Sequence, residues 1–163
     1  MQDVSTLLKN GISMWNVGNP KQALKLFDAV LAIEPKNSEA LLRKGNVLGK
    51  LARYKQAILC YDMVLQHDNK NLLAILNKGL AHHYIGEYDI AISCYDNVLS
   101  ERPENVTALY NKASSLVKSN RIEEGLEILS KVAKKDFSYR AKAKFDDDFV
   151  EIRNLNKFKD IVL

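Results

Sequence analysis

Apolar residues recur at spacings of three and four along most of this chain, the period of an amphipathic α-helix. Short polar breaks, VGNP, LARY, IGEY and SNRI, separate the helical segments in pairs. Longer breaks, EPKNS, HDNKN and RPENV, contain the Pro and Asn residues that favour turns. In the first short break, Asn19 can cap a helix and Pro20 can occupy its first position. The pattern therefore predicts short helices joined by tight turns.

The pattern repeats every 34 residues. Residues 43–62 (RKGNVLGKLARYKQAILCYD) and 77–96 (NKGLAHHYIGEYDIAISCYD) align without gaps, and eight of the twenty positions are identical. The frames are 4–37, 38–71, 72–105 and 106–139, and equivalent positions carry similar residues: Gly11, Gly45, Gly79 and Ala113 at the eighth, Ala23, Ala57, Ala91 and Gly125 at the twentieth, and Phe27, Tyr61, Tyr95 and Leu129 at the twenty-fourth. The small residues are expected to face each other so that two helices approach closely, and the aromatic or leucine side chain is expected to cover the joint.

The 34-residue period and the residues at these three repeated positions together resemble the tetratricopeptide repeat family. The resemblance is best in frame 72–105 and weakest in frame 106–139, which is degenerate: Ala113 and Gly125 exchange sizes, and Phe137 stands where proline is usual. The resemblance implies an all-α fold, a right-handed superhelical α-solenoid of about four helix–turn–helix repeats followed by a capping segment. We expect residues 1–163 to form a single domain of this kind.

Residues 140–163 are too short for a further repeat and are predicted to form C-terminal capping helices, because the last repeat needs its apolar face shielded. Ser138 is expected to cap the first of these helices, and the run Asp146–Asp148 to cap a second. The expected packing residues are Ala141, Phe145, Phe149, Ile152, Phe158, Ile161 and Val162. A detachable tail is the alternative, and the apolar residues favour docking.

Composition narrows the class of protein. The chain has 163 residues, 47% hydrophobic and 27% charged, as expected of a globular domain. No apolar run approaches the roughly 20 residues of a membrane span, and the N-terminus lacks the pattern of a secretory signal, so a cytoplasmic protein is expected. Cys60 and Cys94 lie one repeat apart, too far for a disulfide bond, and are predicted to be free and structural.

The net charge of +4 is unevenly distributed. The stretch 130–145 carries six basic residues against Asp136, which leaves a net charge of −1 on the rest of the chain. The basic residues are Lys131, Lys134, Lys135, Arg140, Lys142 and Lys144. A solvated helix face is the simplest interpretation, and binding of an acidic partner or nucleic acid through residues 131–144 is the alternative.

The sequence carries no enzyme signature. His82 and His83 are adjacent, so they point about 100° apart on a helix and chelate poorly, and His82 is expected in the core. The Asp146–Asp148 run lacks the spacing of a calcium loop, and the glycines do not form a phosphate-binding loop. We expect no metal, no cofactor and no catalytic residue.

The resemblance implies that the first helix of each repeat lines a concave groove that binds a peptide. The candidate groove residues are Lys9, Ile12, Trp15, Asn16, Arg43, Asn46, Lys50, Asn77, Leu80, Tyr84, Tyr110, Asn111, Ser114 and Lys118. Asn77 and Asn111 can donate to and accept from a peptide backbone, and the aromatic side chains are typical binding anchors. The alternative is that the apolar members pack between repeats and the asparagines face water.

The resemblance therefore predicts a non-enzymatic protein-interaction module or scaffold, with a peptide segment or helix of a partner protein in the groove. One subclass of the family grips a terminal carboxylate, but its three cationic positions hold Leu42, Tyr110 and Ser114 here, which disfavours that ligand. Self-association through Leu163 and the last helix is a second hypothesis, so a homo-oligomer stays open. The sequence pattern of the repeats resembles that of prokaryotic members of the family, so a prokaryotic protein is expected.

Overall fold

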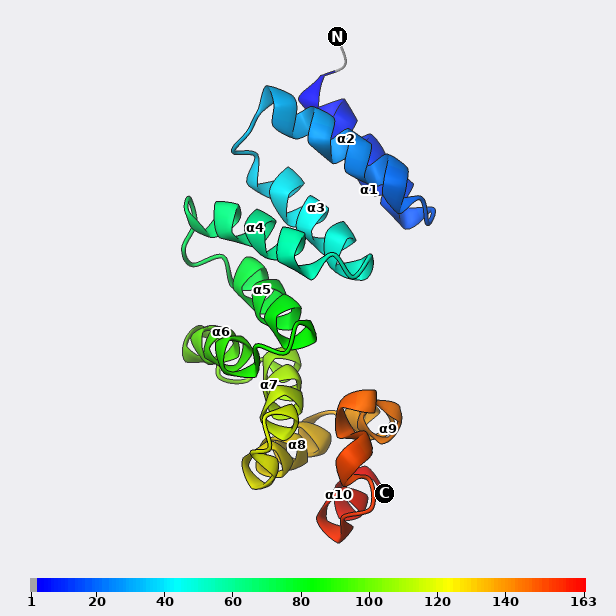
Figure 1. Cartoon of the computed structure of the whole chain (residues 1–163), viewed down its shortest axis with the longest axis vertical. Helices are drawn as coiled ribbons and strands as arrows, with labels where there is room; N and C mark the ends of the chain where they lie inside the picture. Colours follow the sequence, from blue (N-terminus) through cyan, green and yellow to red (C-terminus); the bar gives the residue numbers. More distant parts are fainter. Residues whose placement is uncertain (1–2) are drawn as a thin grey trace. The chain divides into compact units, whose positions relative to one another are not determined.

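The computed structural model describes residues 3–163, and within this range every regular element is helical (Figure 1). The predicted all-α fold of four helix–turn–helix pairs and a C-terminal helical segment is confirmed. The chain divides into two compact units, one ending at Ile85 and the other starting at Gly86.

The first unit contains five helices that follow one another with short connections. They are α1 (Val4–Asn16), α2 (Pro20–Ile33), α3 (Ser38–Lys50), α4 (Tyr54–Leu65) and α5 (Leu72–Tyr84). Each helix packs against the next along the chain, and α3 also contacts both α1 and α5. The first helices of successive repeats therefore lie side by side, which places their inward-facing residues on one continuous face.

The second unit contains the remaining elements. They are α6 (Tyr88–Glu101), α7 (Val106–Lys118), α8 (Ile122–Lys135), α9 (Ser138–Phe145), the 3₁₀ helix η1 (Asp147–Ile152) and α10 (Asn156–Val162). Helix α7 packs against α6 and α8, and η1 lies against α7. Helix α10 contacts α8 and α9, so the C-terminal segment is docked on the last repeat.

Helix starts and stops recur with the 34-residue period. Asn37, Asn71 and Asn105 each accept a hydrogen bond from the backbone N–H three residues later, as N-caps of α3, α5 and α7. Asn19 caps α2 in the same way and Pro20 is its first residue, as predicted. The positive-φ residues that end the first helix of each repeat are Gly18, Ala52, Gly86 and Asn120.

Packing within a repeat differs in one detail from the expectation. A Cβ added to Gly11 would lie 2.6 Å from the ring of Phe27, and one added to Gly45 would lie 2.6 Å from the ring of Tyr61. In these repeats the glycine therefore makes room for the aromatic ring at the twenty-fourth position. In the fourth repeat the eighth and twentieth positions meet directly, because a Cβ on Gly125 would lie 2.9 Å from the carbonyl oxygen of Ala113.

Ion pairs connect consecutive repeats in a regular ladder. In each pair, a lysine on a first helix contacts an aspartate on the preceding second helix: Lys44 with Asp28, Lys78 with Asp62, and Lys112 with Asp96, at 2.5 to 2.6 Å. The lysine side chains are 22 to 29% exposed and the aspartates 39 to 56%, so water partly screens each pair. The ladder helps to fix the register between neighbouring helix pairs.

The C-terminal segment packs differently from the prediction in its first helix. Phe145 is 77% exposed and Ala141 is also exposed, whereas Ala143 is fully buried. The reason is the rotation of α9, which turns Tyr139 and Ala143, four residues apart, toward the core and places the Tyr139 ring 4.9 Å from that of Tyr110. Ser138 is the first residue of α9 and not its N-cap, a position that Phe137 holds without a side-chain hydrogen bond. The backbone N–H of Ser138 donates to the carboxylate of Asp136 at 2.9 Å.

The rest of the C-terminal segment packs as expected. Phe149, Ile152 and Phe158 are buried against α7 and α8, and Ile161 and Val162 are half-buried beside them. Asp146 is the N-cap of η1 and accepts from the Asp148 backbone N–H at 3.1 Å. The apolar residues of the segment complete the core of the second unit.

Candidate functional site: a pocket on the first helices

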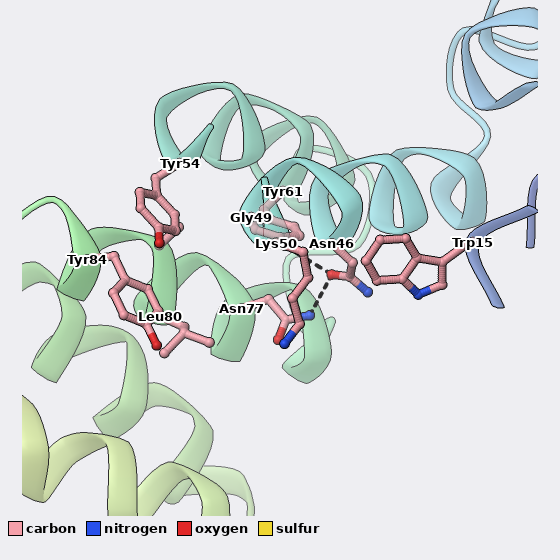
Figure 2. Close-up of a pocket in the computed structure, with 10 residues that line it drawn as sticks. Trp15, Asn46, Gly49, Lys50, Tyr54, Tyr61, Asn77, Leu80 and Tyr84 are labelled. Carbon is pink, nitrogen blue, oxygen red and sulfur yellow. Dashed lines mark hydrogen bonds between the residues drawn. The ribbon is translucent and has the colours of Figure 1, made fainter. Parts of the chain in front are cut away.

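The first unit contains a pocket of about 480 Å³ on the face formed by α1, α3 and α5. It is lined by Trp15, Asn46, Gly49, Lys50, Tyr54, Tyr61, Asn77, Leu80, Ala81 and Tyr84. Asn46 and Lys50 lie one turn apart on α3, as Asn77, Ala81 and Tyr84 do along α5, so the helical period puts them on one face. In Figure 2, Trp15 and the Tyr54–Tyr84 pair lie at opposite ends of the pocket.

A hydrogen-bonded triad forms the polar part of the wall. Oδ1 of Asn46 accepts from the Tyr61 hydroxyl at 3.0 Å and from the side-chain amide of Asn77 at 2.9 Å (Figure 2). Tyr61 is 3% exposed, and burial raises the pKa of its hydroxyl well above the ordinary value, with a smaller contribution from Cys60. The triad fixes both amides, so that Nδ2 of Asn46 and Oδ1 of Asn77 remain available to a ligand.

The aromatic part of the wall comes from two helices. The rings of Tyr54 and Tyr84 stack with centroids 5.0 Å apart and an interplanar angle of 16°. Tyr84 is nonetheless 56% exposed, and Trp15 and Leu80 are half-buried. Such partly exposed aromatic side chains offer a large contact area at a low cost in conformational entropy.

Lys50 supplies the positive charge at the pocket. It lies in the last turn of α3, and no carboxylate among residues 3–163 forms an ion pair with it. Arg43 is also on α3 but does not line the pocket, and it pairs with Glu39 at 3.4 Å. The pocket therefore combines a free cation, two oriented amides and aromatic walls.

The structure places the predicted groove residues of the first unit in two groups. Six of them line the pocket together: Trp15, Asn46, Lys50, Asn77, Leu80 and Tyr84. The other four lie outside it. Lys9 and Asn16 are exposed on α1, Ile12 packs beside the cluster of Ala23, Phe27 and Val47, and Arg43 pairs with Glu39.

Three of the four predicted groove residues of the second unit contact the chain's own C-terminal segment. Tyr110, 2% exposed, donates from its hydroxyl to Asp146 at 2.7 Å, and Ser114 donates to the carboxylate of Asp148. Lys118 pairs with Glu151 at 3.5 Å. Burial, and then the bond to Asp146, raises the pKa of the Tyr110 hydroxyl well above its ordinary value. Asn111 is half-buried between these positions.

The sequence analysis does not include Tyr54 and Tyr61 among the lining residues, because they lie on α4 and it assigns only first-helix positions to the groove. It does not include Ala81 because this position of α5 is not one of the groove positions that the resemblance implies. A signal for Tyr54 was present: the second helix of the next repeat also begins with a tyrosine, Tyr88. The sequence analysis gives Tyr61 only a packing role, but Tyr61 also lines the pocket and its hydroxyl donates to Asn46.

The histidines and cysteines that the sequence analysis considers for metal binding or catalysis lie outside the pocket. His82 and His83 are buried, and Cys60 and Cys94 are not joined in a disulfide bond. Burial raises the pKa of the Cys60 thiol. Among the described residues no three His, Cys, Asp or Glu side chains are grouped as metal ligands. No helix in residues 3–163 is both long enough and apolar enough to span a membrane.

The basic stretch is largely engaged within the second unit. Lys131 pairs with Glu127 and Lys135 with Glu104. Arg140 lies over the ring of Phe137, and the ammonium of Lys142 lies 4.1 Å from the centroid of the Tyr110 ring. These contacts leave Lys134 and Lys144 as the members of the stretch without an ion pair or ring contact in the described chain.

Comparison with known proteins agrees with the helix pairs. The family model described as tetratricopeptide repeat matches residues 16–82, and the one described as anaphase-promoting complex, cyclosome, subunit 3 matches residues 50–132. No curated protein matches the chain.

Solved structures of MamA share the fold. MamA 41-end from Desulfovibrio magneticus RS-1 superposes with a TM-score of 0.77 and 26% identity, covering 81% of this chain and 75% of that one. The MamA RS-1 ArsTM double mutant gives a TM-score of 0.79 at 22% identity, covering 99% and 92%. The repeated helix pairs and the two family matches show that the chain belongs to the tetratricopeptide repeat family.

Proposed function

We propose that this protein is a non-enzymatic scaffold that binds a peptide segment or helix of a partner protein in the pocket on α1, α3 and α5. The observation that carries the proposal is the convergence of six predicted groove residues on one pocket, where oriented amides and exposed aromatic rings lie together. Amides that both donate and accept suit a peptide backbone, and aromatic anchors suit its side chains.

The pocket chemistry favours a protein ligand over a small metabolite. It holds one cation and no carboxylate, and its other polar groups are amides and tyrosine hydroxyls. No His, Cys, Asp or Glu side chain, the groups that most often act as catalytic base or nucleophile, is among the lining residues. A cytoplasmic location and a prokaryotic origin stay predictions from the sequence.

The two alternatives gain no support from the described residues. Nucleic-acid binding needs a free basic surface, and most of the 131–144 stretch is engaged in ion pairs or ring contacts. End-to-end stacking of copies in the repeat register would not continue the ion-pair ladder, because Asn10 and Ser130 stand at the equivalent lysine and aspartate positions. Self-association by another route stays a prediction.

Display selection of random peptides on the wild-type protein tests the proposal. Selected peptides should lose at least about tenfold in affinity, about 1.4 kcal/mol, on the Asn77→Ala/Tyr84→Ala variant. The control is Leu59→Ala/Met63→Ala, which removes two exposed apolar side chains of α4 that do not line the pocket. Equal loss in both variants, or no loss in either, would overturn the proposal.

A further inference from the structure

The second unit shows how a first helix of this protein holds a short acidic segment. Along α7, Tyr110, Ser114 and Lys118 are spaced by four residues and so form a single stripe. Each contacts one acidic residue of the C-terminal segment: Asp146, Asp148 and Glu151, respectively. The stripe and the acidic residues match one to one.

An aromatic side chain completes this docking. Phe149 follows Asp148 directly, is fully buried, and meets the Tyr110 ring edge to face with centroids 5.8 Å apart. The η1 turn thus presents its carboxylates to α7 and inserts a phenyl ring into the apolar core beside them. The recognised unit is an aromatic residue with acidic residues on both sides, carried by a short 3₁₀ helix and its N-cap.

Helix α3 carries the corresponding stripe two repeats earlier. Leu42, Asn46 and Lys50 stand at the positions of Tyr110, Ser114 and Lys118. Asn46 keeps an amide donor where Ser114 has its hydroxyl, and Lys50 keeps the ammonium of Lys118. Whereas Lys118 is paired with Glu151, Lys50 has no carboxylate partner among the described residues.

The surroundings of α3 supply the remaining part of the match. Trp15, Leu80 and the Tyr54–Tyr84 stack form apolar walls next to Asn46 and Lys50 (Figure 2). At the inward positions of α1, α3 and α5, the charges of Arg43 and Glu39 neutralise each other, which leaves Lys9 and Lys50 as the remaining charged residues. The net charge of the face is positive, and it complements an acidic ligand.

We propose that the pocket recognises, in its partner, a helical turn in which an aromatic side chain is flanked by acidic residues, one of them on Lys50. This inference rests on the proposed function and narrows the class of partner segment. The aromatic ring enters the pocket between Trp15 and the tyrosines, and the carboxylates meet the amide of Asn46 and the ammonium of Lys50. A free terminal carboxylate is not part of the recognition.

The probe is a blocked peptide with the sequence of residues 146–153, acetylated and amidated so that it carries no terminal charge. Trp15 is the only tryptophan in the chain and lines the pocket, so its fluorescence reports occupancy there. We expect a saturable change in Trp15 emission that weakens with salt. Peptides with Phe149→Ala or Glu151→Lys should bind at least about tenfold more weakly.

A charge exchange tests the role of Lys50. The Lys50→Glu protein should bind the wild-type peptide at least about tenfold more weakly, and it should regain binding of the Glu151→Lys peptide. Lys25→Glu is the matched control, because it makes the same net-charge change at an exposed site on α2, away from the pocket. Tyr84→Ala is a second variant, which should weaken binding of the wild-type peptide without changing the net charge of the protein.

Two results would overturn the inference: no saturable Trp15 change with the blocked peptide, or equal binding of the wild-type and Glu151→Lys peptides. If display-selected peptides of other chemistry bind the pocket and are lost in Asn77→Ala/Tyr84→Ala, the proposed function stands and only the acidic–aromatic class fails. If neither the selected peptides nor the blocked peptide depends on pocket residues, both proposals fail.

Discussion

The side-chain amide of Asn77 on α5 donates a hydrogen bond to Oδ1 of Asn46 on α3, at 2.9 Å. The hydroxyl of Tyr61, on α4, donates to the same oxygen at 3.0 Å. A single amide oxygen thereby joins three helices at the wall of the pocket. Shape and polarity of the pocket depend on this shared acceptor, because it orients both asparagine amides.

Removing the shared acceptor should destabilise the protein. Asn46→Ala leaves the buried Tyr61 hydroxyl without its acceptor, so the free energy of unfolding should fall by about 1–3 kcal/mol. Urea denaturation measures the effect. Tyr61→Phe should cost only about 1 kcal/mol, and the double variant less than the sum of the two, since they share one interaction. Strict additivity would show that the bond contributes nothing.

Two glycines one turn apart on α3 should respond oppositely to alanine. Gly45→Ala places a methyl group 2.6 Å from the Tyr61 ring, and such overpacking typically costs about 1–3 kcal/mol. At Gly49 the nearest atom lies 3.9 Å away, so alanine should stabilise the helix by about 0.5–1 kcal/mol. Thermal unfolding of both variants checks the sign. A loss of stability in Gly49→Ala would contradict the packing described here.

Ala52 is strained at a position where two other repeats have glycine. Its φ is +56°, and the left-handed conformation costs a non-glycine residue about 1–2 kcal/mol. Ala52→Gly should therefore raise stability by about 0.5–1 kcal/mol, after the greater entropy of glycine in the unfolded chain is counted. Gly18→Ala, at the equivalent position with φ of +77°, should have the reverse effect. Chemical denaturation compares the pair.

The C-terminal segment offers two phenylalanines with opposite surroundings. Phe149 is fully buried, and its replacement by alanine should cost about 3–5 kcal/mol. Phe145 is 77% exposed, and Phe145→Ala should change stability by no more than about 0.5 kcal/mol. Calorimetry of the two variants distinguishes a docked segment from a detached one. Equal, small effects would mean that the segment does not pack on α7.

Stability should decline at alkaline pH through Tyr61 and Tyr110. Both hydroxyls have pKa values raised in the folded protein, mainly by burial, so the folded state holds its protons more tightly. The stabilisation is complete below about pH 10, the ordinary tyrosine pKa. Above it the unfolded state alone releases the protons, and the free energy of unfolding falls as pH rises toward the folded-state pKa.

Urea denaturation at pH values on either side of 10 measures this decline. The double variant Tyr61→Phe/Tyr110→Phe should show a shallower alkaline slope than the wild-type protein, because both titrating groups have been removed. An unchanged slope would assign the alkaline loss to other groups, such as the lysines of the ion-pair ladder.

The sequence by itself determined the helix pairs, their turns and the inward-facing positions, because these depend on local rules that recur every 34 residues. Asn37, Asn71 and Asn105 cap helices at one repeated position. Trp15, Asn46 and Asn77 stand at inward-facing positions of α1, α3 and α5, and they line one pocket because the repeat sets these first helices side by side. A helix boundary assigned wrongly in one repeat would disagree with the equivalent positions of the other repeats, so the repetition itself checks each assignment.

Only the tertiary structure decided what happens where the repetition ends. The rotation of α9, which buries Ala143 and exposes Phe145, follows from contacts of Tyr139 with Tyr110 and has no counterpart in another repeat. For the same reason the sequence did not indicate that Tyr110, Ser114 and Lys118 meet the acidic residues of the C-terminal segment. These partners lie more than 30 residues apart, and their pairing depends on how a non-repeating segment packs, which periodicity does not encode.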